Sequence, residues 1–142
     1  MTSATIRHSE ITRYKYRVEE TLAVQTKIRP PQPINQEDFG ITMDGVVIAK
    51  KGYLWDGASG PAIQRKQNRR ASCIHDVLAE AMRQGLLPQS NWIPANEELG
   101  RLCIEDGMSP WWAINIYVRG VSLTNNWCRV TCKPEHPILE AP

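Results

Sequence analysis

The hydrophobic residues of this 142-residue chain change their spacing partway along it, and this change limits the folds open to it. Between residues 13 and 26 they fall on even positions, the period of a strand with one buried face: Tyr14, Tyr16, Val18, Leu22 and Val24. Between about residues 68 and 84 they recur at steps of three and four, the period of a helix capped by Gly85: Ile74, Val77, Leu78, Ala81 and Met82. We therefore predict an α+β fold, with a small N-terminal antiparallel β sheet packed on about three C-terminal α helices in a single domain over 1–142.

Residues 10–56 form the part of the chain that we expect to be rich in strands. The alternating stretch over residues 13–26 fits one long bent strand or two short ones. The segment Pro30-Pro31-Gln32-Pro33 is a connector or an edge, because proline donates no hydrogen bond to a sheet.

The clearest local signal for β structure is Asp44-Gly45, which joins two apolar runs over residues 39–43 and 46–49. The pair suits the positive φ angles of a tight hairpin turn. A turn at Lys50-Lys51-Gly52 then leads into a third short strand, Tyr53-Leu54-Trp55, which we expect to end where Asp56 begins.

Residues 68–124 form the part that we expect to be helical. Pro94 suits the first turn of a second helix, and Gly107 ends that helix. Ser109-Pro110 has the form of an N-cap followed by a first-turn proline, and the apolar residues after it predict a third helix, the most deeply buried of the three. An irregular tail is expected over residues 133–142.

The charge balance and the lack of long apolar runs exclude several classes of protein. With 17 basic and 15 acidic residues the net charge is +2, too small to make a polyanion the default partner, so we do not expect binding to nucleic acid. No apolar run reaches the roughly 18 residues that a transmembrane helix needs, and the N-terminus has no signal-peptide core. We expect a protein made in the cytoplasm, without a transmembrane segment.

The four cysteines include no C-x-x-C motif, and we expect them to be reduced: Cys73, Cys103, Cys128 and Cys132. Cys128 and Cys132 are four residues apart. This spacing fits either a shared helix face or a metal site with an outside ligand.

The loop after the third predicted strand concentrates groups that can bind a ligand. It reads Trp55-Asp56-Gly57-Ala58-Ser59-Gly60-Pro61. Asp56 offers a carboxylate, Ser59 a hydroxyl, and Gly57 and Gly60 a backbone that a substrate can approach closely. The same residues also suit a tight turn with no ligand.

His75 and Asp76 follow on the first predicted helix and complete the candidate site. Imidazole titrates near neutral pH, so His75 suits the role of general base that activates water. Asp76 and Asp56 can hold a divalent cation or orient other groups, so these three residues are our catalytic candidates. The alternative is that His75 is a structural histidine and Asp76 a carboxylate that faces solvent.

Basic and polar residues near the two segments could extend the site. Arg70, with its basic neighbours, could meet a phosphate or an anionic polymer of the cell envelope, or belong to a solvated basic loop. Asn96 and its neighbouring glutamates could add polar groups from the second helix, although glutamates in a first helical turn are explained by the helix dipole alone. Beyond His75 only His8 and His136 remain, too few for an HD-type metal phosphohydrolase, and no H-E-x-x-H, G-x-S-x-G or Walker motif is present.

The order of these motifs resembles a family of phage and prophage proteins, the domain-of-unknown-function family 1353. The resemblance runs from about Gly52 to Gly120 and rests on D-G-A-S-x-P followed by H-D-x-L and, on the next helix, Ala95-Asn96-x-x-Leu99. The family pattern has a tyrosine where this chain has Ala79 and an aspartate where it has Asn96. The resemblance implies a phage or prophage origin, with family genes often among tail and lysis functions.

A looser likeness is to secreted phospholipases, in which a glycine loop lies upstream of a helical H-D-x-C-Y. There the histidine activates water and the aspartate binds calcium, and this chain has its glycine loop and His75-Asp76 in the same order. The disulfides and the tyrosine of those enzymes are absent, so the likeness supplies a template for mechanism only.

Two functions follow as hypotheses. The first is a hydrolase-like His-Asp site, directed at a cell-envelope component and assisted by a divalent cation. The second is a non-enzymatic virion protein of the phage tail or tail tip, partnered by other tail proteins, in which the same residues form a structural network. In both, the protein is made in the host cytoplasm, and in the second it is incorporated in the virion.

Overall fold

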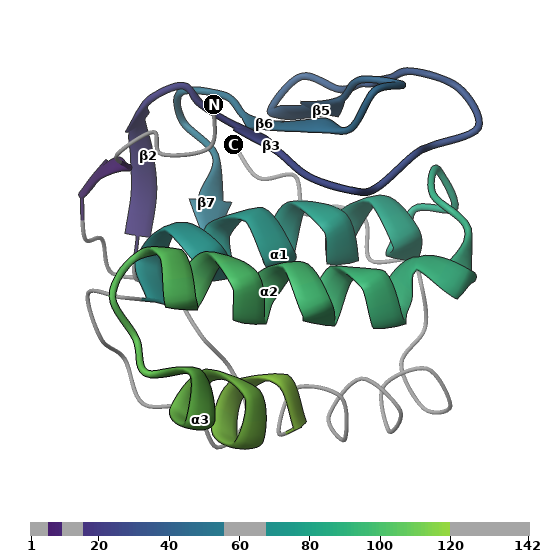
Figure 1. Cartoon of the computed structure of the whole chain (residues 1–142). Helices are drawn as coiled ribbons and strands as arrows, with labels where there is room; N and C mark the ends of the chain where they lie inside the picture. The colour runs from purple at the N-terminus through teal and green to yellow at the C-terminus, as the bar shows by residue number, and fades with distance from the viewer. Residues whose placement is uncertain (1–5, 10–15, 56–67, 120–142) are drawn as a thin grey trace.

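The computed structural model describes residues 6–9, 16–55 and 68–119, and these form the predicted α+β arrangement with strands first and helices after (Figure 1). The strands lie on one side of a pair of long helices, which run side by side, and a shorter helical segment lies on the other side of that pair. The buried hydrophobic residues of the strands and of the two long helices form one continuous core. This arrangement confirms the predicted fold class.

The strands form two antiparallel sheets, where the sequence led us to expect one. The first sheet has the order β1-β2-β7, with β1 at Arg7–Ser9, β2 at Tyr16–Glu20 and β7 at Leu54–Trp55. The second has the order β3-β6-β5-β4, with β3 at Leu22–Gln25, β4 at Ile34–Asn35, β5 at Phe39–Ile41 and β6 at Val46–Ala49.

The alternating stretch is therefore two short strands that pair with different partners. Before Thr21, β2 pairs with β7, and after Thr21, β3 pairs with β6. The turn at residues 50–52 causes this change of partner, because Gly52 donates to the Val18 carbonyl and its φ of 96° turns the chain away from β6. The predicted alternation of buried residues holds in both strands.

The β5–β6 hairpin forms where Asp44-Gly45 predicted it, but with a different turn. Only Gly45 has a positive φ, of 97°, whereas the prediction required positive angles at both residues. The Gly45 amide donates to the Thr42 carbonyl at 3.0 Å, which makes a four-residue turn followed by a glycine bulge. A Cβ at Gly45 would also collide with Arg29 Nη1 and with the Thr26 carbonyl, so glycine is required twice over.

The two long helices are α1 at Arg69–Arg83 and α2 at Trp92–Glu105, as the apolar spacing predicted. They are antiparallel, because a short connection that contains the 3-10 turn η2 (Gln89–Asn91) joins them. Gly85 follows the end of α1 as the predicted cap, with a φ of 77°. Its amide donates to the Met82 carbonyl, and the Leu86 amide donates to the Ala81 carbonyl. Pro94 lies in the first turn of α2, as predicted. Among the described residues, no helix is long and apolar enough to cross a membrane.

The third helical segment begins as the sequence indicates, with Ser109 as N-cap accepting a hydrogen bond from the Trp112 amide. It consists of α3 (Pro110–Trp112) followed by a π-helical segment, η3 (Ala113–Val118). We expected it to be the most deeply buried helix, and that expectation is wrong for its described side chains. Its main contact with the long helices is with α2, and Trp111 is 64% exposed and Ile114 47% exposed.

Candidate functional site

His75 lies in the interface between α1 and α2. Ala71, Leu78 and Met82 are also buried and follow the same three- and four-residue steps along α1. His75 is 8% exposed, and its Nε2 lies 2.7 Å from Oδ1 of Asn96 on α2. The ring of Trp92 lies beside it, with centroids 6.4 Å apart. The histidine thus belongs to a polar pair inside the helix interface.

Burial lowers the pKa of His75 below its ordinary value of 6.5, since a charged ring loses more hydration than a neutral one. The hydrogen bond with Asn96 acts in the opposite direction, and the charge of Arg83 lowers the pKa further. His75 is therefore neutral at pH 7 and keeps a lone pair that can accept a proton. A neutral imidazole held by a polar partner has the chemistry of a general base.

Asp76 does not share the surroundings of His75. Successive helix residues are turned by about 100°, and Asp76 is half-buried on a part of α1 close to Tyr53 and Cys73. Burial raises the pKa of the Tyr53 hydroxyl and of the Cys73 thiol, and the negative charge of Asp76 raises both further. The histidine is held by Asn96, so its sequence neighbour is not its partner at Nε2.

The loop that carries the rest of the predicted site lies outside the described residues. This applies to Asp56, Gly57, Ser59 and Gly60, whose catalytic, substrate-binding and cation-binding roles stay predictions. Within residues 6–9, 16–55 and 68–119, no group of three or more His, Cys, Asp or Glu side chains is arranged to hold a metal ion. The predicted cation site pairs Asp76 with Asp56, and so it also stays a prediction.

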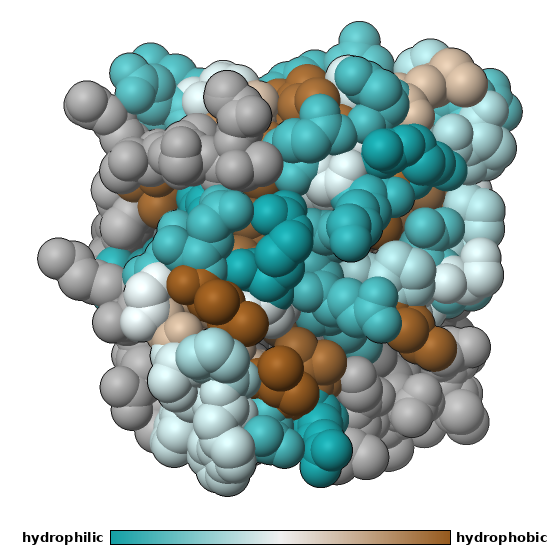
Figure 2. Space-filling view, in the orientation of Figure 1, coloured by the Kyte–Doolittle hydropathy of each residue, from teal (hydrophilic) through white to brown (hydrophobic). Residues whose placement is uncertain are grey.

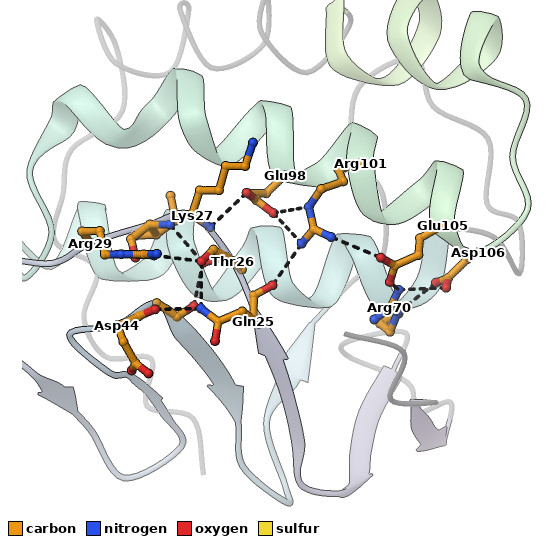
Figure 3. Close-up of polar contacts among 12 residues, drawn as sticks. Gln25, Thr26, Lys27, Arg29, Asp44, Arg70, Glu98, Arg101, Glu105 and Asp106 are labelled. Carbon is orange, nitrogen blue, oxygen red and sulfur yellow. Dashed lines mark hydrogen bonds and ion pairs between the residues drawn. The ribbon is translucent and has the colours of Figure 1, made fainter. Parts of the chain in front are cut away.

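Arg70 occupies a structural position (Figure 3). Its side chain is 2% exposed, and its guanidinium contacts Glu105 at 2.7 Å and Asp106 at 2.9 Å, both at the end of α2. Burial opposes the positive charge, but the hydrogen bonds to Asp106 and Glu105 outweigh it and raise the pKa of Arg70 above its ordinary value. Arg70 thus ties the start of α1 to the end of α2, which leaves its predicted contact with a substrate without support from this geometry.

Glu98 is a buried polar residue whose position the sequence did not reveal. Of the two interpretations that the sequence left open for the glutamates after Asn96, a place in the first helical turn is wrong for Glu98, because α2 begins at Trp92. Its carboxylate accepts hydrogen bonds from the Lys27 amide at 3.1 Å and from Arg101 Nε at 2.8 Å, and Arg101 also donates to the Gln25 carbonyl at 3.0 Å (Figure 3). This network fixes the end of β3 to α2.

The two described cysteines, Cys73 and Cys103, are free and buried, as predicted. Burial raises the pKa of Cys73, and it raises that of Cys103 to about 12, so neither thiol is a ready nucleophile. Cys128 and Cys132 lie outside the described residues. On the face shown in Figure 2, hydrophobic side chains lie in separate spots over the helices. The large hydrophobic residues that are exposed on α2, α3 and η3 are Ile93, Ile104, Trp111 and Ile114.

In comparisons with protein-family models, curated proteins and solved structures, no match to this chain was found. The resemblance to the domain-of-unknown-function family 1353 therefore stays a prediction from the loop and helix motifs. The geometry around His75 is then the main support for any proposal about function.

Proposed function

We propose that this protein is a phage- or prophage-encoded hydrolase, directed at a cell-envelope component, in which His75 is the general base. The observation that carries the proposal is the buried pair of His75 and Asn96, whose atoms lie 2.7 Å apart between α1 and α2. A histidine that is neutral at pH 7 and held in one orientation meets two requirements for activating water.

In the proposed reaction, water loses a proton to the imidazole of His75 while its oxygen forms a bond to the electrophilic atom of the substrate. The proton then passes to the leaving group. Asp76, together with Asp56, holds a divalent cation or orients groups around it, and Ser59 and the glycines of the loop contact the substrate. These loop roles rest on the sequence motifs alone.

The test compares the full-length protein with a His75→Asn variant. Asparagine keeps a polar side chain for Asn96 to meet but has no titratable nitrogen. Hydrolysis of purified peptidoglycan and of phospholipid vesicles is measured with Mg²⁺, with Ca²⁺ and with EDTA. We expect a cation-dependent activity that falls by ~100-fold or more in the variant, the usual contribution of a general base.

Gln84→Ala provides the matched control, because Gln84 is an exposed polar residue just past the end of α1. It should retain the wild-type rate, and circular dichroism should give the same fold for all three proteins. A His75→Asn variant as active as the wild type would eliminate the hydrolase proposal.

A second candidate is a structural protein of the phage tail or tail tip, and the burial of the polar groups favours it. Arg70, His75, Asn96 and Glu98 are all buried and all have partners within the chain, as expected if they only support the fold. This proposal predicts that the protein is part of purified particles and that His75→Asn particles assemble and infect normally. Its absence from purified particles would contradict the structural role.

A further inference from the structure

The contact between His75 and Asn96 indicates which of the two ring nitrogens of His75 carries the hydrogen. Asn96 is 3% exposed and His75 is 8% exposed, so water has little room to take the place of either partner. The atoms in contact are Nε2 of the ring and Oδ1 of the amide, at 2.7 Å. This distance is typical of a well-formed hydrogen bond.

An amide oxygen only accepts hydrogen bonds, so the nitrogen that faces it must donate. A neutral imidazole carries a single N–H. When that hydrogen is on Nε2, the lone pair is on Nδ1. Among the residues that the structure describes, Nδ1 of His75 has no hydrogen-bond partner.

We infer that Asn96 is a positioning residue that holds His75 in the Nε2-protonated tautomer and so makes Nδ1 the single basic atom of the ring. The assignment of the tautomer stands on the contact itself. The role of Nδ1 as the atom that receives the proton from water rests on the proposed function. A neutral amide orients the ring without supplying a negative charge beside it, which an aspartate at position 96 would do.

The opposite arrangement has a distinct and measurable signature. If the Asn96 amide were turned over, its NH₂ group would donate to Nε2, and the ring hydrogen would lie on Nδ1. The two arrangements exchange the protonated and unprotonated nitrogens of the ring. Nitrogen-15 chemical shifts separate these two states of histidine directly.

The experiment records long-range ¹H–¹⁵N correlation spectra of the full-length ¹⁵N-labelled protein under conditions where histidine is neutral. The chain has three histidines, so the signals lost in the His75→Asn variant identify His75. We expect Nε2 of His75 at the protonated shift and Nδ1 at the unprotonated shift. The reverse order would overturn the inference.

Two substitutions at position 96 test whether Asn96 causes the preference. Asn96→Leu removes the acceptor, and the two nitrogen shifts should move toward each other as the tautomers mix. Asn96→Asp keeps an acceptor oxygen and should keep Nε2 protonated, whereas Gln84→Ala should leave the ring signals unchanged. An unchanged tautomer in Asn96→Leu would show that Asn96 does not position the ring.

If Asn96→Leu fails to fold, the wild-type and Asn96→Asp spectra still decide the tautomer, because a mixed or reversed pattern in either would contradict the inference. The spectra also separate this inference from the proposed function. A His75→Asn variant with full activity would remove the hydrolase while the tautomer assignment stood. A reversed tautomer together with an inactive His75→Asn variant would remove the tautomer assignment, while the requirement for His75 in hydrolysis stood.

Discussion

The interface between α1 and α2 contains two buried polar connections of different kinds. At one end, the charged Arg70 meets two carboxylates from the end of α2. Farther along the same interface, the neutral ring of His75 meets the neutral amide of Asn96. The first connection joins full charges, and the second joins dipoles.

The difference shows how burial limits polar side chains. Two carboxylates that remain about 30% exposed offset the charge of the buried Arg70, so removing them exposes a large desolvation cost. His75 avoids that cost by staying neutral, because burial lowers its pKa. In the described part of the chain, the charged groups of the first connection all form ion pairs, and Glu105 also pairs with Arg101, whereas the neutral pair leaves one ring nitrogen of His75 available for chemistry.

The largest effect is expected when the charged connection is broken from the acidic side. In a Glu105→Gln/Asp106→Asn double variant, the guanidinium of Arg70 stays buried without its two carboxylates. Leaving a buried charge without partners should lower the free energy of unfolding by about 3 kcal/mol. Removing negative charge from the C-terminal end of α2 should offset a few tenths of a kcal/mol of this loss, because of the helix dipole. Urea unfolding followed by circular dichroism measures the change.

The control for this prediction is Glu19→Gln, which breaks the solvent-exposed pair of Arg17 and Glu19. That pair should contribute no more than about 0.5 kcal/mol to the free energy of unfolding. Equal losses in the two variants would mean that burial does not distinguish the pairs.

A smaller effect is expected when the neutral connection is broken. Asn96→Leu leaves the ring N–H of His75 unsatisfied and should lower the free energy of unfolding by about 1–2 kcal/mol. Adding His75→Leu replaces both partners by apolar groups and should recover part of the loss. A double-mutant cycle gives the coupling between the two positions, and additive losses would argue against a direct interaction.

The smallest effect is expected from pH: the titration of His75 should make the free energy of unfolding depend on pH. Since the pKa of His75 is lowered in the folded state, the unfolded chain binds more protons once the pH falls below 6.5. The stabilisation is thus complete above about pH 6.5 and is lost progressively below it.

The comparison of wild type with His75→Asn isolates this contribution, because other titrating groups are common to both proteins. Unfolding free energies at about pH 7.5 and about pH 5.5 should converge for the two proteins as the pH falls. Parallel pH profiles would show that His75 is not protonated differently in the folded and unfolded states.

Local patterns were enough to predict most secondary structure. The alternation through Val18 and Val24 predicted buried strand faces, and the spacing of Ile74, Val77 and Leu78 predicted α1. These predictions depend on neighbouring residues in the chain, whose geometry fixes which side chains share a face. The hairpin at Gly45 was found for the same reason, although its turn differs from the predicted one.

Longer-range features escaped the sequence because they depend on partners far along the chain. The exchange of strand partners at Thr21 requires the turn at Gly52, about thirty residues later. The buried position of Glu98 requires the amide of Lys27, and that of Arg70 requires the end of α2. No local pattern of residues specifies these contacts between distant parts of the chain.

The candidate site illustrates the same division. The sequence by itself determined that a histidine lies beside the apolar stripe of α1 and that a polar residue lies on the following helix, because helical spacing is local. Only the tertiary structure decided that His75 meets Asn96, because the packing of α2 on α1 selects which polar side chain of α2 the ring reaches. It likewise decided that the charge of Asp76 acts on the distant Tyr53, because the strands pack on α1.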